Sequence, residues 1–166
     1  MRTVNIATKL IAALGVVAIG VFAAFLATPH RPATDANVVT LDGRTVSIAA
    51  LKGKVTAVNF WATWCGACIR EMPKMVEAHR KYAPQGYEMV AIAVRDRPEA
   101  VAEYAQRNAL PFRVALDAGE AALRFGNVRI TPTTFLIDRN GRVLKRFVGE
   151  PDWKEYEALV ERALAD

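Results

Sequence analysis

The stretch F-W-A-T-W-C-G-A-C-I-R-E-M-P at residues 60–73 decides the fold. It holds the only two cysteines of the 166-residue chain, Cys65 and Cys68, which are separated by two residues. Residues 55–60 form a short, nearly continuous apolar run, which is typical of a strand buried on both faces. The apolar pattern then becomes helical over residues 66–82. The cysteine pair is therefore predicted at a strand-to-helix junction.

This placement predicts a reactive thiol at Cys65. Unpaired backbone N–H groups and the dipole at a helix N-terminus stabilise negative charge, so the Cys65 thiolate should form more readily than that of a free cysteine. Cys68 follows three residues later on the same helix face, near enough for a disulfide. Cys65 is the candidate nucleophile, and Cys68 is the candidate thiol that resolves a mixed disulfide.

The cysteine count limits the other kinds of site. Two cysteines exclude a disulfide-stapled mini-protein, a four-cysteine zinc site and a cysteine-held iron–sulfur cluster. A zinc site would need two further ligands, and the only histidines are His30 and His79, of which His79 is expected to be an ordinary helix-surface residue. A structural disulfide closing so short a loop would add little stability. These alternatives rank below an exchangeable dithiol.

Strands and helices alternate along the rest of the chain, which predicts an α/β fold with βαβ units. Asp42-Gly43 predicts the turn of a hairpin over residues 38–48, and Asn140-Gly141 predicts a second hairpin that ends the sheet with antiparallel pairing. The other expected elements are strands at residues 87–94, 112–116, 133–137 and 143–148, and helices at residues 99–108, 118–125 and 153–164.

Residues 10–27 carry no charge, and all but two glycines belong to the hydrophobic set. As a helix they would be about 27 Å long, close to the roughly 30 Å of a bilayer core. Arg2 and Lys9 precede them, so the positive-inside bias predicts that everything following is exported. A cleaved secretory signal is the alternative, and it exports the domain as well. We expect a transmembrane signal-anchor at residues 1–28, a linker at 29–37 and one domain at 38–166.

A second motif makes the pattern specific. I-T-P-T-T-F-L-I-D-R-N-G-R-V at residues 130–143, together with residues 60–73, resembles the thioredoxin superfamily and, within it, the membrane-anchored TlpA/ResA-like thiol–disulfide oxidoreductases. The resemblance covers about residues 38–166. It implies a thioredoxin-like fold, with a mixed central sheet flanked by helices, an N-terminal β-hairpin and a helix–strand insertion near residues 98–116. It also implies that Pro132 is a cis proline facing the active site.

The resemblance assigns roles around the cysteines as well. Its Cys-x-x-Cys-x-x-Glu-x-Pro pattern gives Glu71 a catalytic role beside the two cysteines, and we expect Glu71 to manage the proton of Cys68. Asn59 stands where thioredoxins themselves have a buried aspartate, and asparagine cannot take a proton. Gly66 and Ala67 form the dipeptide that helps to set the redox potential. Thioredoxin's proline is absent at Ala67, which leaves an extra N–H near the sulfurs and favours a less reducing couple.

Substrate contacts are implied for three residues. The family pattern makes Trp64 an exposed apolar platform beside the disulfide, whereas Trp61 is expected in the core. The backbone around Thr131 and Pro132 would pair with an incoming peptide.

The sequence thus predicts a cofactor-free extracytoplasmic thiol–disulfide oxidoreductase, and more specifically a disulfide reductase. We expect a monomer held by one span in the bacterial inner (cytoplasmic) membrane, with its catalytic domain on the periplasmic side. By resemblance, its substrates are the disulfides of apocytochrome c or copper chaperones, in cytochrome c maturation or copper-chaperone thiol reduction, and its electron donor is a membrane protein of the CcdA/DsbD type. The formal charge is +5, and +3 without Arg2 and Lys9, with interspersed signs, so no nucleic-acid partner is expected.

Two other functions remain as alternatives. A Sco-like Cu(I) metallochaperone would use Cys-x-x-x-Cys with a distal histidine, and the spacing here is one residue shorter. A peroxiredoxin-like peroxidase would need the P-x-x-x-T-x-x-C arrangement, which is absent before Cys65.

Overall fold

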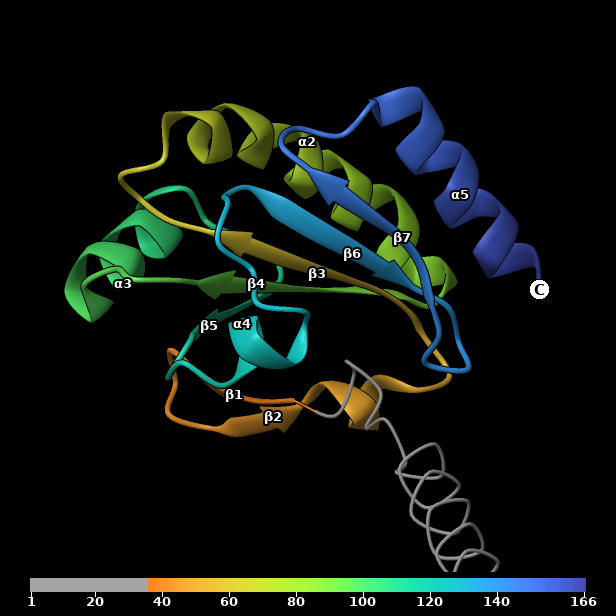
Figure 1. The fold of residues 1–166 in the computed structure, drawn as a ribbon. Coiled ribbons are helices and arrows are strands. Elements are labelled where there is room, and N and C mark those ends of the chain that lie inside the picture. Colours follow the sequence, from red (N-terminus) through yellow and green to blue (C-terminus); the bar gives the residue numbers. More distant parts are fainter. Residues whose placement is uncertain (1–35) are drawn as a thin grey trace, which may run out of the picture. The chain divides into compact units, whose positions relative to one another are not determined.

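A seven-stranded mixed sheet forms the centre of the domain, in the order β2-β1-β5-β4-β3-β6-β7 (Figure 1). The computed structural model describes residues 36–166. The expected membrane segment and most of the expected linker lie outside the described residues. Among residues 36–166 there is no helix with the length and apolar character needed to span a membrane.

Parallel pairing is confined to the three middle strands β3, β4 and β5. The N-terminal hairpin β1–β2 joins β5 antiparallel, and β6 and β7 extend the other side antiparallel, so the predicted mixed sheet with its two hairpins is confirmed. The strands are β1 (Asn37–Thr40), β2 (Thr45–Ser47), β3 (Val55–Trp61), β4 (Tyr87–Ala93), β5 (Arg113–Leu116), β6 (Thr133–Ile137) and β7 (Val143–Val148).

Helices cover both faces of this sheet. In Figure 1, α2 and α5 lie along one face and α4 lies on the other, while the N-terminal hairpin forms one edge of the sheet. α3 and β5 form the predicted helix–strand insertion. The helices are α2 (Gly66–Tyr82), α3 (Pro98–Arg107), α4 (Ala121–Arg124) and α5 (Trp153–Ala165), with short 3-10 helices η1 (Ile48–Leu51) and η2 (Ala83–Gln85).

Two boundaries differ from the sequence pattern. Ala36 is fully buried and its carbonyl accepts from the N–H of Ile48, so the domain includes residues that the polar composition suggested as linker. The expected helix at residues 118–125 is only the four residues of α4. Asp117 explains this, because its Oδ1 accepts from the N–H groups of Gly119 and Ala121 and folds the chain into a turn, with Gly119 at a φ of +93°.

Strand alternation decides which side chains face α2. In β3, Val55, Ala57 and Trp61 belong to the same apolar cluster as the buried side of α2, whereas Val58 and Phe60 belong to the cluster on the opposite face. Because strand side chains alternate with a period of two, Asn59 also points toward α2. A polar side chain is thereby placed inside the layer between the sheet and the helix.

The buried stripe of α2 contains one carboxyl group. Its buried members recur at helical spacing and face the sheet. Glu71 falls in this stripe and is 0% exposed. The other members are Cys68, Met72, Met75, Ala78 and Tyr82.

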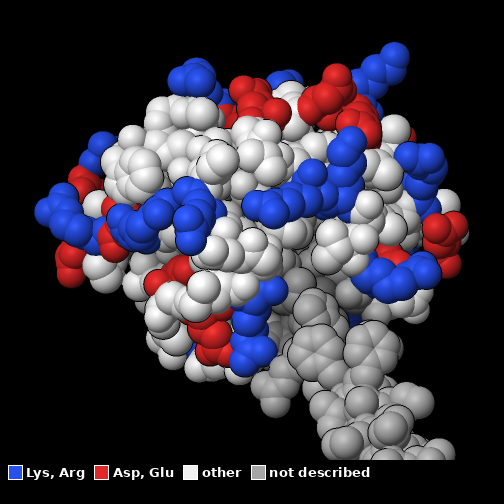
Figure 2. Space-filling model, viewed as in Figure 1, with Lys and Arg blue, Asp and Glu red and all other residues white. Residues whose placement is uncertain are grey.

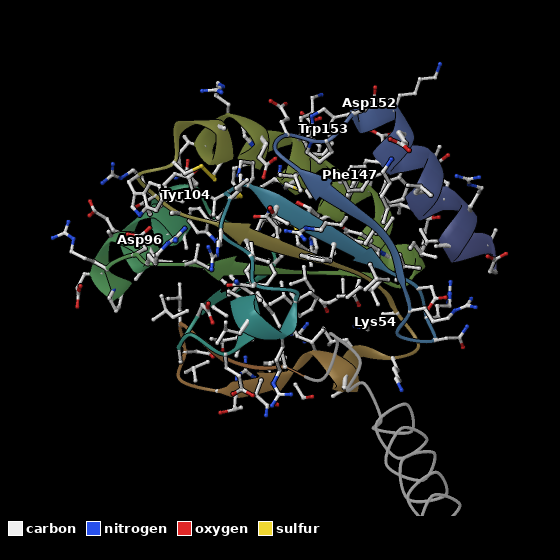
Figure 3. All side chains as sticks on the ribbon, in the orientation of Figure 1. Lys54, Asp96, Tyr104, Phe147, Asp152 and Trp153 are labelled. Carbon is white, nitrogen blue, oxygen red and sulfur yellow. A yellow bond between two sulfur atoms is a disulfide. The ribbon has the colours of Figure 1, made fainter. Side chains whose placement is uncertain are left out.

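An aromatic cluster attaches α5 to the sheet (Figure 3). Phe147 of β7 and Trp153 of α5 both pack against Tyr156, with ring centroids 5.7 and 5.5 Å apart. The Asp152 carboxylate accepts from the N–H of Glu155 and caps the start of α5. This cluster belongs to the same apolar core as the buried side of α2.

His79 is not the simple surface residue that we expected. It is half-buried, with its ring against Tyr87 and Phe112 at centroid distances of 6.3 and 5.6 Å. Burial lowers its pKa below the usual value, and the charge of Glu88 opposes that shift. The physical reason lies in the helix period: His79 follows Cys68 by about three full turns, so it returns close to the buried face.

Candidate functional site

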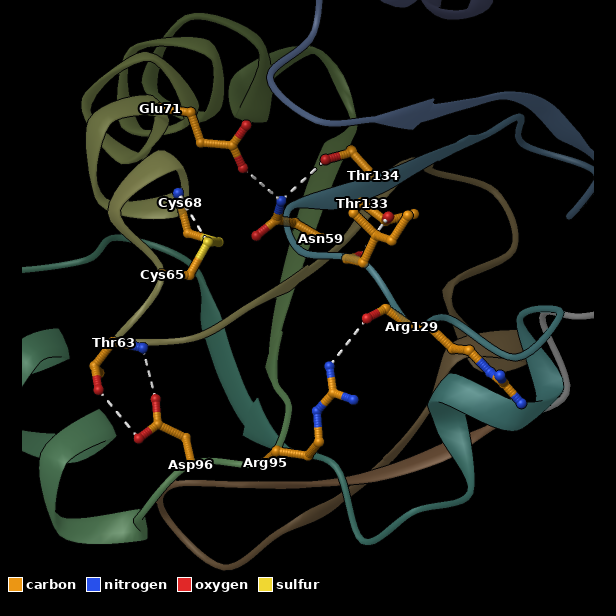
Figure 4. The surroundings of a disulfide bond; sticks show 11 residues. Asn59, Thr63, Cys65, Cys68, Glu71, Arg95, Asp96, Arg129, Thr133 and Thr134 are labelled. Atoms are coloured by element: carbon orange, nitrogen blue, oxygen red, sulfur yellow. Dashed lines mark hydrogen bonds between the residues drawn. A yellow bond between two sulfur atoms is a disulfide. The ribbon is translucent and has the colours of Figure 1, made fainter.

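The two cysteines form a disulfide at the start of α2 (Figure 4). Their Cα atoms are 5.3 Å apart. Cys65 is the N-cap residue of α2, and its Sγ accepts from the Cys68 N–H at 3.2 Å. Cys65 keeps 7% of its surface exposed, whereas Cys68 has none. The first sulfur therefore lies at the helix N-terminus, as the sequence predicted, and it is also the more exposed of the two.

The backbone N–H that donates to the Cys65 sulfur is not that of Ala67, the position where thioredoxin's proline is absent. The N–H that contacts Cys65 belongs to Cys68, and among the described residues no hydrogen bond joins the Ala67 N–H to a sulfur. Gly66 is exposed in the first turn of α2. The effect of the Gly66-Ala67 dipeptide on the redox potential stays a prediction.

Glu71 lies one helical turn after Cys68, on the same buried face of α2 (Figure 4). Its Oε1 accepts from Nδ2 of Asn59 at 2.9 Å, and the same Nδ2 donates to Oγ1 of Thr134 at 2.9 Å. Oε2 of Glu71 and Oδ1 of Asn59 are buried without a hydrogen-bond partner among the described residues. Two polar oxygens are thus left free in the layer that holds Cys68.

The environment of Glu71 changes its ionisation. Burial is the largest effect and raises the pKa of Glu71 to about 8. The hydrogen bond from Asn59 lowers this pKa, and the charge of Glu150 raises it. A carboxyl group with this pKa is mostly protonated at pH 7 and titrates close to an unperturbed thiol, whose pKa is about 8.5. It is suited to exchanging a proton with Cys68.

Replacing Asn59 with leucine is expected to remove the only donor to Glu71 among the described residues. The pKa of Glu71 should rise further, because the lost hydrogen bond favours the ionised carboxyl. The free energy of unfolding at pH 7 should fall by about 1–3 kcal/mol, the cost of leaving a buried acceptor unpaired. Urea unfolding measures this. Gln106→Leu, at an exposed position of α3, is the control and should change stability by no more than about 0.5 kcal/mol. Equal losses in the free energy of unfolding for the two variants would contradict the role of Asn59 as the buried hydrogen-bond donor to Glu71.

The loop between β4 and α3 holds the segment that carries Trp64. The Asp96 carboxylate accepts from the backbone N–H of Thr63 at 2.6 Å and from its hydroxyl at 3.0 Å. Nε1 of Trp64 donates to the Arg95 carbonyl at 3.1 Å. Trp64 is 59% exposed, in contrast to the fully buried Trp61. The expected split between a core tryptophan and a surface tryptophan is confirmed.

The third part of the site is the segment that enters β6. The Thr131–Pro132 peptide bond is cis, as expected. The pairing of Thr133 with Phe60 places this segment at the same end of the sheet as the cysteines. The Pro132 carbonyl accepts from the Gly149 N–H at 2.8 Å, while no backbone hydrogen bond involves Thr131 among residues 36–166. The backbone of Thr131 is therefore available to an incoming chain.

Sequence reasoning missed four residues of this site: Thr63, Arg95, Asp96 and Thr134. A signal was present, because Arg95 and Asp96 come directly after the buried strand β4. The carboxyl ends of parallel strands meet at one edge of a sheet, so polar residues after β4 are expected near the cysteines that follow β3.

The comparisons with known proteins agree with this geometry. A family model described as Redoxin matches residues 28–164. The chain belongs to the Redoxin family. Within it, the thiol-disulfide oxidoreductase ResA of Bacillus thuringiensis is 35% identical over 125 residues, 75% of this chain and 72% of the relative. ResA of Geobacillus kaustophilus is 36% identical over 129 residues, 78% and 74% of the two chains.

Solved structures lead to the same assignment. This Redoxin-family domain superimposes on a thiol:disulfide interchange protein of the thioredoxin family from Chlorobium tepidum with a TM-score of 0.73 and 35% identity. The match covers 80% of this chain and 95% of the other. The chain is a ResA-like thiol–disulfide oxidoreductase of the thioredoxin superfamily, with Cys65 and Cys68 as its Cys-x-x-Cys pair.

Proposed function

We propose that this Redoxin-family chain works as a reductase of disulfides in exported polypeptides, with Cys65, Cys68 and Glu71 as its catalytic residues. The proposal rests on how the two cysteines differ in exposure and in their position on α2. Cys65 is the more exposed sulfur and caps the helix, whereas Cys68 is buried on the face that holds Glu71. One sulfur can meet a substrate, and the other can act only after the first has reacted.

The reaction has two exchange steps. In the reduced protein the Cys65 thiolate attacks one sulfur of the substrate disulfide, that S–S bond breaks, and the departing substrate thiolate takes a proton. Cys68 then loses its proton and attacks Sγ of Cys65, which releases the second substrate thiolate. Two electrons pass to the substrate, and the Cys65–Cys68 disulfide of this structure is the product.

Glu71 serves the second step. Its ionised form accepts the proton of Cys68, and its protonated form returns one when the pair is reduced again. Because the pKa of Glu71 is about 8, transfer to or from a thiol of ordinary pKa costs little free energy. Asn59 and Thr134 act as positioning residues for the carboxyl group.

The substrate polypeptide is proposed to lie across Trp64 and along the backbone of Thr131 and Pro132. Trp64 offers an exposed ring beside the reacting sulfur, and the unpaired backbone of Thr131 offers main-chain hydrogen bonds. Gly66 and Ala67 tune the redox potential. No cofactor beyond the dithiol takes part in these steps.

The cellular setting follows from the sequence. The apolar residues 10–27 and the preceding basic residues support one span in the bacterial inner membrane, with a monomeric domain on the periplasmic side. The ResA relatives support protein disulfides as substrates and a redox partner that reduces the pair again. We propose apocytochrome c or copper-chaperone disulfides as substrates and a membrane donor of the CcdA/DsbD type.

Equilibration of the purified protein with glutathione buffers tests the direction of electron flow. The reductase proposal expects a reduction potential of Cys65–Cys68 more negative than about −200 mV, toward the thioredoxin end of the known range. Acid-quenched thiol alkylation followed by mass spectrometry reports the oxidised fraction in each buffer. A potential near about −120 mV, the value of a strong oxidant, would contradict the proposal.

A further inference from the structure

Two arginines lie on the loops around the disulfide, Arg95 in contact with Trp64 and Arg129 just before the cis-proline segment (Figure 4). Arg95 lies in the loop between β4 and α3, and Nη2 of its guanidinium donates to the Arg129 carbonyl at 3.1 Å. Arg129 stands two residues before Thr131. Neither arginine forms an ion pair in the part of the chain that the structure describes. Their positive charge is therefore not neutralised by a direct partner.

The carboxylate of Asp96, next to Arg95 in the same loop, is already hydrogen-bonded to other groups. Both Asp96 oxygens accept hydrogen bonds, from Thr63 and from the N–H of Arg97. Figure 4 shows Asp96 directed at Thr63, while the Arg95 guanidinium extends the other way toward Arg129. In Figure 2, Lys and Arg side chains form a band across the middle of the face shown. The exposed Arg95 and Arg129 thus offer positive charge to a partner.

Arg95 adopts a backbone conformation that favours glycine. Its φ is +51°, in the left-handed region, where a residue with a Cβ atom is strained. In this conformation its carbonyl accepts from Trp64 and its guanidinium reaches Arg129. One residue thereby links the two loops that border the reacting sulfur. A guanidinium has five N–H groups, so several remain for a ligand.

Large apolar side chains accompany these charges. Trp64 is 59% exposed and Ile130 is 60% exposed, so both are open to a partner. We call Trp64, Arg95, Arg129 and Ile130 the docking surface. An apolar side chain can pack on Trp64 or Ile130, and a carboxylate can form bidentate hydrogen bonds with Arg95 or Arg129.

We propose that the docking surface selects polypeptide disulfides whose cysteine is flanked by acidic residues. The inference rests on the proposed function and adds the substrate class. The substrate carboxylates pair with Arg95 and Arg129 while an apolar neighbour of the reacting cysteine packs on Trp64. Since opposite charges steer encounter, the preference acts mainly on kcat/KM and weakens with salt.

Two disulfide peptides that differ only in having two glutamates or two lysines beside the cysteine test this proposal. The full-length chain is assayed with dithiothreitol as the reductant. At low ionic strength the wild type is expected to reduce the glutamate peptide at least fivefold more efficiently. Arg129→Glu should reverse the preference, because it raises kcat/KM for the lysine peptide, a gain that mere damage to the fold cannot produce. Arg80→Gln, an exposed arginine on the distal part of α2, is the matched control and should keep the wild-type ratio.

The outcomes distinguish a failure of the docking proposal from a failure of the proposed reductase function. Equal efficiency for both peptides in the wild type, or an unchanged preference in Arg129→Glu, would overturn the docking proposal while leaving the reductase function intact. If neither peptide nor an uncharged disulfide were reduced, the proposed function itself would fail. Reduction of an uncharged disulfide by the wild type and by Arg80→Gln alike, with selectivity between the charged peptides reversed only in Arg129→Glu, supports both.

Discussion

Replacing Cys65 with serine is expected to lower the turnover of a protein disulfide by at least about three orders of magnitude, to the uncatalysed rate. A serine hydroxyl at the α2 N-cap is not ionised at neutral pH and cannot form a disulfide, so the first exchange step has no nucleophile. The fold should survive, because the substitution removes little volume from a residue at the edge of the core. The dithiothreitol-coupled reduction of an insulin-type disulfide measures the loss.

Cys68→Ser provides the contrast for this prediction. It should also abolish turnover, yet its Cys65 should still attack and remain joined to the substrate, because the buried resolving thiol is absent. A single-turnover burst is therefore expected in Cys68→Ser and none in Cys65→Ser. A burst in Cys65→Ser, or full turnover in either variant, would show that the roles of the sulfurs are misassigned.

Replacing Glu71 with glutamine is expected to stabilise the oxidised protein at alkaline pH. In the folded state burial raises the pKa of Glu71 to about 8, against an ordinary value of about 4.5. Between these two values the folded state binds a proton that the unfolded chain has lost, so the free energy of unfolding falls as pH rises through this window. The shift corresponds to a loss on the order of 4 kcal/mol by pH 8. Glutamine cannot ionise, and the variant avoids this loss.

Urea unfolding of the oxidised proteins from pH 4 to pH 9 checks the prediction. The stability of Glu71→Gln relative to wild type should increase steadily from about pH 5 to pH 8 and then level off. Glu77→Gln, an exposed position on the same helix paired with Lys74, should show no such trend. A difference that stays constant with pH, or one that decreases as pH rises, would rule out a buried carboxyl of raised pKa.

The dithiol and its helix could be predicted because their determinants are local. The apolar run before Cys65, the helical stripe after it and the spacing of the two cysteines all lie within about 30 consecutive residues. These patterns predicted α2 over residues 66–82 as the structure has it. The cis Thr131–Pro132 bond depended on the family resemblance, because spacing alone does not distinguish it from an ordinary proline at a strand entry.

The remainder of the site depends on how distant segments pair. Trp64 and Arg95 are 31 positions apart, and their contact exists only because β3 and β4 run parallel and end at one edge. Asn59 and Thr134 are 75 positions apart and meet because β6 pairs with β3 in one particular register. A slip of one residue would turn Thr134 to the opposite face of the sheet. The sequence pattern does not specify that register.

In the proposed reaction Cys65 is the sulfur that attacks substrate disulfides. Mixing the reduced Cys68→Ala protein with a disulfide peptide and mapping the covalent product by mass spectrometry tests this role. We expect one mixed disulfide, located at Cys65 and released by dithiothreitol, and a much slower adduct in Cys65→Ala, whose remaining thiol at Cys68 is buried. Rapid adduct formation at Cys68 in Cys65→Ala, with none at Cys65 in Cys68→Ala, would contradict it.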